Sequence, residues 1–91
     1  TEQLSAIFSA LSNPIRLKIL SIISETKRPL HIKAVAKTLQ MDYAAVYRHV
    51  EILKEAGLVQ IFEVGRSRVL SPLHGEIIDQ IFALAQRIAH E

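Results

Sequence analysis

An acid-free segment at residues 43–48 contains Tyr43, Ala44, Ala45, Tyr47 and Arg48. A guanidinium can donate two parallel hydrogen bonds to guanine O6 and N7 or to a phosphate, and small residues let a helix approach a groove closely. The next acids, Glu51 and Glu55, come where such a helix would leave the phosphates. We interpret Arg48 as a base or phosphate contact. The alternative is a salt bridge to Glu51, Glu55 or another acid.

Tyr43 and Tyr47 lie one helical turn apart in this segment. Each could offer a hydroxyl to a phosphate and a ring edge to the thymine methyl, beside the small side chain of Ala44. The alternative is packing on the protein's own surface. We include Tyr43, Ala44 and Tyr47 with Arg48 among the candidate DNA contacts.

Two further basic groups lie outside this segment. Lys33 and Lys37 fall on an outward helix face, where they would bind phosphate and position the protein. Arg66, Ser67 and Arg68 occupy a turn that suits a phosphate or a narrow minor groove. The alternatives are a solvated helix face for the lysines and a turn that is basic for solubility alone.

Two polar residues are expected to be structural. Arg16 stands at the start of an apolar helix, where we expect an internal ion pair or a cap. His49 falls beside the apolar stripe of Val46 and Val50 and is predicted to be half-buried and hydrogen-bonded to a neighbouring helix.

Four helices must position these side chains. Apolar residues at helical spacing predict a first helix over 4–11 and a third over 32–39. Asn13 as N-cap and Pro14 at the first helical position predict that a second helix lies between the first and the third. This helix is apolar around most of its circumference, so we expect it at the centre of the core. Asp42 is expected to cap a fourth helix that ends before Gly57. The third and fourth helices then form a helix-turn-helix.

A β-hairpin and a last helix complete the chain. Residues 58–64 and 68–73 read as strands joined by a turn at 65–67, and residues 74–90 form a helix with a broad apolar face. The order α-α-α-α-β-β-α predicts a mainly α fold with a small hairpin wing, the winged helix-turn-helix.

Two stretches resemble the ArsR-type family of bacterial and archaeal transcriptional regulators. Leu-Ser-Asn-Pro-Ile-Arg-Leu-Lys-Ile-Leu at 11–20 is similar to the family's Leu-Ser-Asp-Pro-Thr-Arg-Leu-x-Ile-Leu. Val-Tyr-Arg-His-Val-Glu-Ile-Leu-Lys-Glu-Ala-Gly-Leu-Val at 46–59 is similar to Val-Ser-Arg-His-Leu-x-x-Leu-x-x-Ala-Gly-Leu-Val, and Gly65-Arg66 follows at a fitting distance. The resemblance covers roughly 4–90. Tyr43 and Tyr47 depart from the small polar residues that are usual there, which affects the expected sequence preference.

The terminal helices 4–11 and 74–90 would leave a large apolar patch on a monomer. We predict that they form a homodimer interface, as the first and last helices do in the resembled family. The alternative is that both helices close the protomer core. A two-fold dimer would set its recognition helices about 34 Å apart and read a pseudo-palindrome. The predicted interface residues are Leu4, Ile7, Phe8, Leu11, Ile77, Ile81, Leu84 and Ile88.

Composition narrows the remaining choices. The chain has 91 residues, 49% of them hydrophobic and 22% charged, with a formal net charge of +2, which fits one globular domain over 1–91. It has no cysteine, no serine–histidine–acid constellation and no phosphate-cradling glycine loop, so we expect no enzyme. We expect no cofactor and no membrane segment.

Metal sensing is common in the resembled family, but its ligands are not reproduced here. The cysteine positions of one type correspond to His31 and Lys33. A second type needs a spacing that is not matched by His74, Glu76, Asp79, His90 and Glu91. We expect no metal site, and a small-molecule effector stays an open alternative.

Together these features predict a sequence-specific regulator that binds double-stranded DNA as a homodimer and represses from an operator. Lacking a leader, it is expected in the cytoplasm, associated with the nucleoid. The alternatives are a winged-helix adaptor that binds proteins and a chromatin-packing protein indifferent to sequence.

Overall fold

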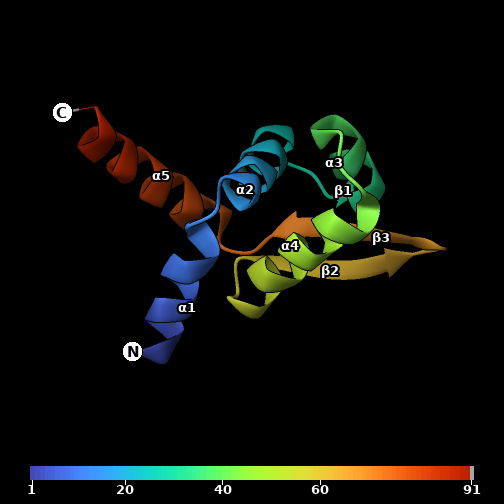
Figure 1. Cartoon of the computed structure of the whole chain (residues 1–91), viewed down its shortest axis with the longest axis horizontal. Coiled ribbons are helices and arrows are strands. Elements are labelled where there is room, and N and C mark those ends of the chain that lie inside the picture. The colour runs from blue at the N-terminus through green and yellow to red at the C-terminus, as the bar shows by residue number, and fades with distance from the viewer. Residues whose placement is uncertain (91) are drawn as a thin grey trace.

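The computed structural model describes residues 1–90 and has a mainly α architecture with one small antiparallel sheet (Figure 1). Its elements are, in order, α1 (Glu2–Leu11), α2 (Pro14–Thr26), β1 (Leu30–His31), α3 (Ile32–Leu39), α4 (Tyr43–Glu55), β2 (Val59–Val64), β3 (Ser67–Pro72) and α5 (Gly75–Ala89). The predicted winged helix-turn-helix is confirmed, with α3 and α4 as its helix-turn-helix and β2–β3 as its wing. The terminal helices differ from their predicted ranges by one or two residues at an end.

The start of α2 follows from two adjacent residues. The Asn13 side chain accepts hydrogen bonds from the backbone N–H of Ile15 at 2.8 Å and of Arg16 at 3.2 Å. Pro14 occupies the first turn, where its missing N–H leaves no intrahelical bond unmade. Both predictions for this helix start are confirmed.

Of the two predictions for the ends of α4, the one at the start is wrong and the one at the end is confirmed. Asp42 stands at the N-cap position, but its side chain makes no cap hydrogen bond. This first turn is at the surface, so water can satisfy its N–H groups without a side-chain acceptor. Gly57 follows the helix with φ +81°, and its N–H bonds to the Lys54 carbonyl at 2.9 Å, as expected of a residue that ends a helix.

The sheet contains one strand that the sequence did not predict. β1 pairs antiparallel with β3, with Leu30 opposite Leu70 and His31 opposite Val69, and gives the strand order β1-β3-β2. A two-residue strand is too short to show a period of two. The hairpin turn is also tighter than predicted, because Ser67 already pairs with Val64 and leaves two residues in the turn.

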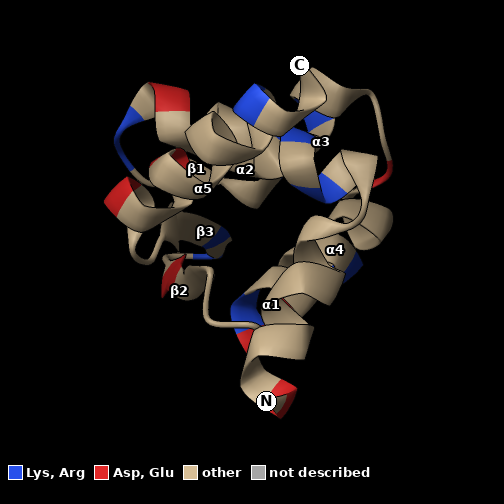
Figure 2. Cartoon of the chain, turned by 90° about the vertical axis from the view of Figure 1, so that its left-hand side faces the viewer, with Lys and Arg blue, Asp and Glu red and all other residues tan. Residues whose placement is uncertain are grey.

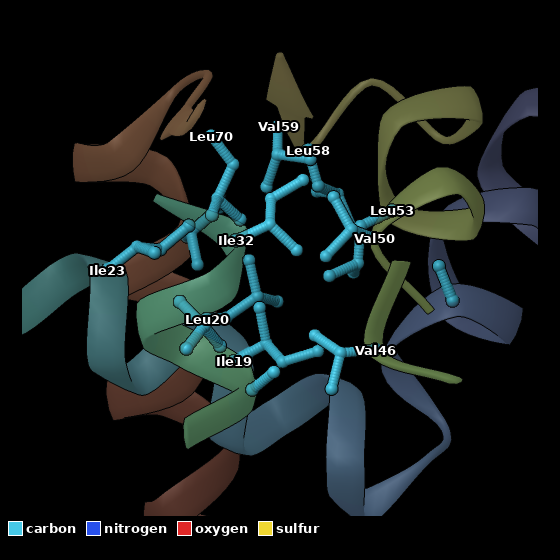
Figure 3. Packing of buried hydrophobic residues seen from close by; sticks show 14 residues of the cluster. Ile19, Leu20, Ile23, Ile32, Val46, Val50, Leu53, Leu58, Val59 and Leu70 are labelled. Carbon is cyan, nitrogen blue, oxygen red and sulfur yellow. The ribbon is translucent and has the colours of Figure 1, made fainter. Parts of the chain in front are cut away.

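The core forms around α2, as its all-round apolar sequence predicts. Ile19 and Ile23 of this helix are fully buried and pack with side chains from α3, α4 and the sheet (Figure 3). Val46, Val50 and Leu53 of α4 are each 0% exposed, so one face of α4 is held against the core. The opposite face of α4 therefore lies at the surface.

The terminal helices project from one side of this core, and the tip of the wing lies at the other end of the molecule (Figure 1). Ile78 is the one fully buried residue of α5. A hydrogen bond from the Ser24 hydroxyl to Asp79 Oδ1, 2.6 Å long, joins α5 to α2. Within residues 1–90 no single helix has the length and apolar character to cross a membrane, and the pair α1–α2, which passes that test jointly, is bent by 87°.

Candidate nucleic-acid interface

The exposed face of α4 carries most of the segment that the sequence singled out. Tyr43, Ala44 and Arg48 are exposed, while Tyr47 is half-buried. Because Val46 and Val50 anchor the other side of the helix, these side chains are held outward along its first two turns. The structure thus presents the predicted segment on one surface.

The two tyrosines pack against each other and against the wing. Their rings are stacked, with centroids 6.1 Å apart and planes inclined by 7°. The guanidinium carbon of Arg68 in β3 lies 4.6 Å from the centroid of the Tyr47 ring, within the range of a cation–π contact. Surface packing, one of the two roles considered for the tyrosines, is therefore present, and it connects α4 to the wing.

A hollow of about 320 Å³, which we call the wing cleft, opens between the wing and the helix-turn-helix. Its lining side chains carry amine, guanidinium, imidazole or hydroxyl groups and belong to His31, Lys33, Tyr43, Arg66, Ser67 and Arg68. No acid is among them. Five of these residues were predicted as separate DNA contacts, and the fold brings them together. The other four predicted contacts lie outside this lining: Lys37, Ala44 and Arg48 are exposed, and Tyr47 is half-buried.

His31 is the cleft residue that sequence reasoning missed as a DNA contact. It reaches the wing because β1 pairs with β3, which places His31 opposite Val69, next to Arg68. The only signal in the sequence was its position two residues before Lys33. The pKa of Arg68 is raised, first by hydrogen bonding to the Tyr43 side chain and then by Tyr47, so Arg68 stays charged at any physiological pH.

Arg16 and His49 form a structural bridge beside this surface. The Arg16 guanidinium caps the end of α1 by donating from Nε to the Ala10 carbonyl at 2.7 Å and from Nη2 to the Ser9 carbonyl at 3.2 Å. Its Nη1 lies 3.2 Å from Nδ1 of His49 in α4. The cap predicted for Arg16 and the half-buried, hydrogen-bonded role predicted for His49 are both confirmed.

The bridge requires a neutral imidazole. Arg16 can only donate, so Nδ1 of His49 must accept and the ring proton must be on Nε2. Burial lowers the pKa of His49, and the positive charges of Arg16 and Arg48 lower it further. Both effects keep His49 uncharged near neutral pH.

The terminal helices expose much of the apolar stripe predicted for them. Leu4 and Phe8 of α1 are 53% and 60% exposed, and Leu84 and Ile88 of α5 are 58% and 80% exposed. Ile7, Leu11 and Ile81 are half-buried, so part of the stripe packs on the protomer itself. The ribbons of α1 and α5 carry few charged positions on the side shown in Figure 2.

A groove of about 510 Å³ lies where α1 and α5 meet the end of α4. Ile7 of α1 and Ile77 and Ile81 of α5 are among its lining residues. Among residues 1–90, no three His, Asp or Glu side chains gather closely enough to hold a metal ion.

Comparison with solved structures defines the class of this domain. A crystal structure of a possible transcriptional regulatory protein from Mycobacterium bovis superposes with a TM-score of 0.85 at 28% identity, covering 99% of this chain and 94% of that one. A solution structure, described as the homodimeric winged helix-turn-helix DNA-binding domain of a possible ArsR-family regulator from the same organism, gives 0.82 at 28% identity over 99% and 81%. The chain is a winged helix-turn-helix domain of the ArsR type, which confirms the resemblance seen in its motifs.

The family follows from the sequence match. The HVO_A0114 family matches residues 11–77, and the chain belongs to that family. An uncharacterized HTH-type transcriptional regulator of Methanocaldococcus jannaschii is 47% identical over 51 residues, 56% of this chain and 52% of that protein. An HTH-type transcriptional regulator of Mycobacterium tuberculosis is 30% identical over 90 residues, 99% of this chain and 38% of that protein. The chain thus spans about half or less of the length of these relatives.

Proposed function

We propose that the chain is a sequence-specific double-stranded DNA-binding regulator that acts as a homodimer and represses from a pseudo-palindromic operator. The observation that carries the proposal is the surface shared by α4 and the wing. There Arg48, Arg66 and Arg68 stand beside an acid-free helix start, on a fold whose neighbours and relatives are described as transcriptional regulators. A protein with this role works on the chromosome, and hence in the cytoplasm.

The proposed docking follows from the orientation of α4. Its amino-terminal half would enter the major groove, with Arg48 contacting bases or phosphate and Tyr43 and Ala44 beside it. Lys37 would contact the phosphates from α3, and the wing would reach the adjacent backbone. The carboxylates of Glu51 and Glu55 come later on the helix, beyond the phosphates.

The proposed dimer interface is built from α1 and α5. The exposed apolar side chains of α1 and α5 would form a large patch on the surface of a monomer. The solution structure of the M. bovis neighbour is described as homodimeric. An isologous interface would relate the two recognition helices by a two-fold axis. Two half-sites about one helical turn apart would then be read together.

Selection from a randomised duplex pool, followed by titration of the enriched duplex across salt concentrations, tests the proposal. A specific dimer enriches a two-fold site, and its affinity falls by about 0.9 log units per log unit of salt for each phosphate contact. Replacement of Arg66 by alanine removes one such contact per protomer and should reduce the slope by about 1.8.

The double variant Arg48→Ala/Arg66→Ala should lose most of its affinity for the enriched site. Its matched control is Lys18→Ala/Lys54→Ala, which removes the same charge from outside the first two turns of α4 and the wing. Equal losses in both variants would contradict the assigned surface. Binding without an enriched site would favour the chromatin-packing alternative, and no binding at low salt would favour the protein-binding adaptor.

A further inference from the structure

The wing cleft brings together polar side chains from three separate parts of the chain, and two of these parts supply positive charge. Lys33 comes from the first turn of α3, the Tyr43 hydroxyl from the start of α4, and Arg66 and Arg68 from the wing. Cations that converge on one hollow act on the same bound anion, so their attraction is greater there than on a flat surface. The nearest acid in the hairpin is Glu63. It stands opposite Arg68 in the register of β2 and β3 but does not line the cleft.

The wall of the cleft is held in place before any ligand arrives. Arg68 rests on the Tyr47 ring at 4.6 Å, and Tyr47 is stacked on Tyr43. A free surface arginine loses rotamer freedom when it binds an anion, whereas a stacked guanidinium has already lost much of it. Tyr47 does not line the hollow, so its contribution is to orient Arg68.

We propose that the wing cleft seats one phosphodiester group of the DNA backbone in each protomer. Lys33, Arg66 and Arg68 supply the positive charge, His31 and the hydroxyls of Tyr43 and Ser67 supply further hydrogen bonds, and Tyr47 is a positioning residue for Arg68. The inference rests on the proposed DNA-binding function and deepens it. A free phosphorylated small molecule offers the same phosphate chemistry. We assign the polymer because the cleft lies beside the start of the proposed recognition helix.

The test neutralises one phosphate at a time. Each linkage of the enriched duplex is replaced in turn by a methylphosphonate, and the affinity of the full chain is measured. If the cations converge on one group, neutralisation at a single linkage per half-site lowers affinity about tenfold or more, because several charge-assisted hydrogen bonds are lost together. Cations that act independently would spread smaller losses over neighbouring linkages.

Substitutions then assign that linkage to the cleft. In each of Lys33→Gln and Arg66→Gln the penalty at the sensitive linkage should fall about twofold, since one of its three cationic partners is already gone. Lys37→Gln is the matched control, one turn further along α3 and outside the cleft lining. It should lower overall affinity yet leave the penalty at that linkage unchanged.

Tyr47 is tested by a pair of variants. Tyr47→Phe keeps the ring under Arg68 and should preserve the single-linkage penalty, whereas Tyr47→Leu removes the aromatic face and should reduce that penalty. Thermal unfolding of each variant establishes that it is folded. A loss in Tyr47→Phe equal to that in Tyr47→Leu would mean that the hydroxyl itself binds, and it would overturn the positioning role.

The remaining outcomes separate the cleft from the proposed function. Normal duplex binding with no sensitive linkage, or with a sensitive linkage that responds equally to Lys37→Gln, would overturn the phosphodiester seat and leave the regulator intact. Inorganic phosphate is titrated in parallel by ¹H–¹⁵N spectroscopy. Shifts around His31 and Lys33 without a sensitive linkage would assign the cleft to a free phosphate. Absence of both phosphate and duplex binding would overturn the cleft and the regulator together.

Discussion

The replacement of Leu84 by glutamine tests the proposed dimer interface directly. Leu84 lies on the outer stripe of α5 and is 58% exposed in the protomer. Full burial of a leucine side chain contributes about 1.5–3 kcal/mol, so covering the exposed fraction contributes about 0.9–1.7 kcal/mol. Two-fold symmetry places the substitution in both copies, and the loss doubles to about 1.7–3.5 kcal/mol. The dissociation constant of the dimer should therefore rise about 20- to 300-fold.

Sedimentation equilibrium over a range of protein concentrations measures this constant. Glutamine has a high helix propensity and a length close to that of leucine, so α5 should stay helical, which circular dichroism can check. Val64→Gln is the matched control, because Val64 is 53% exposed but lies on the wing. If Leu84→Gln dimerises as tightly as Val64→Gln, the outer stripe of α5 is not the interface and the reasoning from its exposure fails.

Three further variants test the local structure. Asn13→Ala should cost about 1 kcal/mol in urea unfolding, because it removes the acceptor for two N–H groups at the start of α2, and Asn13→Asp should restore most of it. The pKa of His49 is lowered from 6.5 in the folded protein, so as pH falls through 6.5 the unfolded chain takes up a proton first. The free energy of unfolding should therefore fall as pH drops below about 7 and level off below the folded pKa of His49. His49→Asn keeps an acceptor near the position of Nδ1 and should flatten that profile. An unchanged profile would refute the role of His49. Gly57→Ala should cost about 1 kcal/mol from its φ of +81° alone, since nothing lies within 4 Å of the added methyl. Gly75→Ala at the start of α5, without a positive φ, should be close to neutral, and equal losses at the two glycines would show that backbone conformation is not the cause.

The predictions that succeeded depend on neighbours within a few turns of chain. The start of α2 at Asn13-Pro14, the end of α4 at Gly57 and the buried stripe of Val46 and Val50 all follow from local hydrogen bonding or helical periodicity. Where local chemistry permits more than one outcome, prediction was weaker. Asp42 stands in the expected position but makes no cap, because an exposed helix start can be hydrated instead.

The candidate site was predicted in its residues but not in its arrangement. Lys33, Tyr43 and Arg68 were each considered a separate contact, with the two tyrosines undecided between DNA and surface packing. Their meeting in one cleft depends on β1, whose two residues carry no readable pattern. The contact between Arg68 and the Tyr47 ring joins positions 21 residues apart and has no signature in sequence spacing.

Local sequence patterns were enough to predict the order of the helices and the hairpin, the central place of α2 and the acid-free start of α4, since side-chain spacing and capping act over one or two turns. The tertiary structure alone decided that Arg16 bridges the end of α1 to His49 and that Arg68 rests on Tyr47. These contacts arise because burial of the shared core fixes the distances between elements that are far apart in the chain. Core packing therefore brings basic residues from separate elements together on one surface.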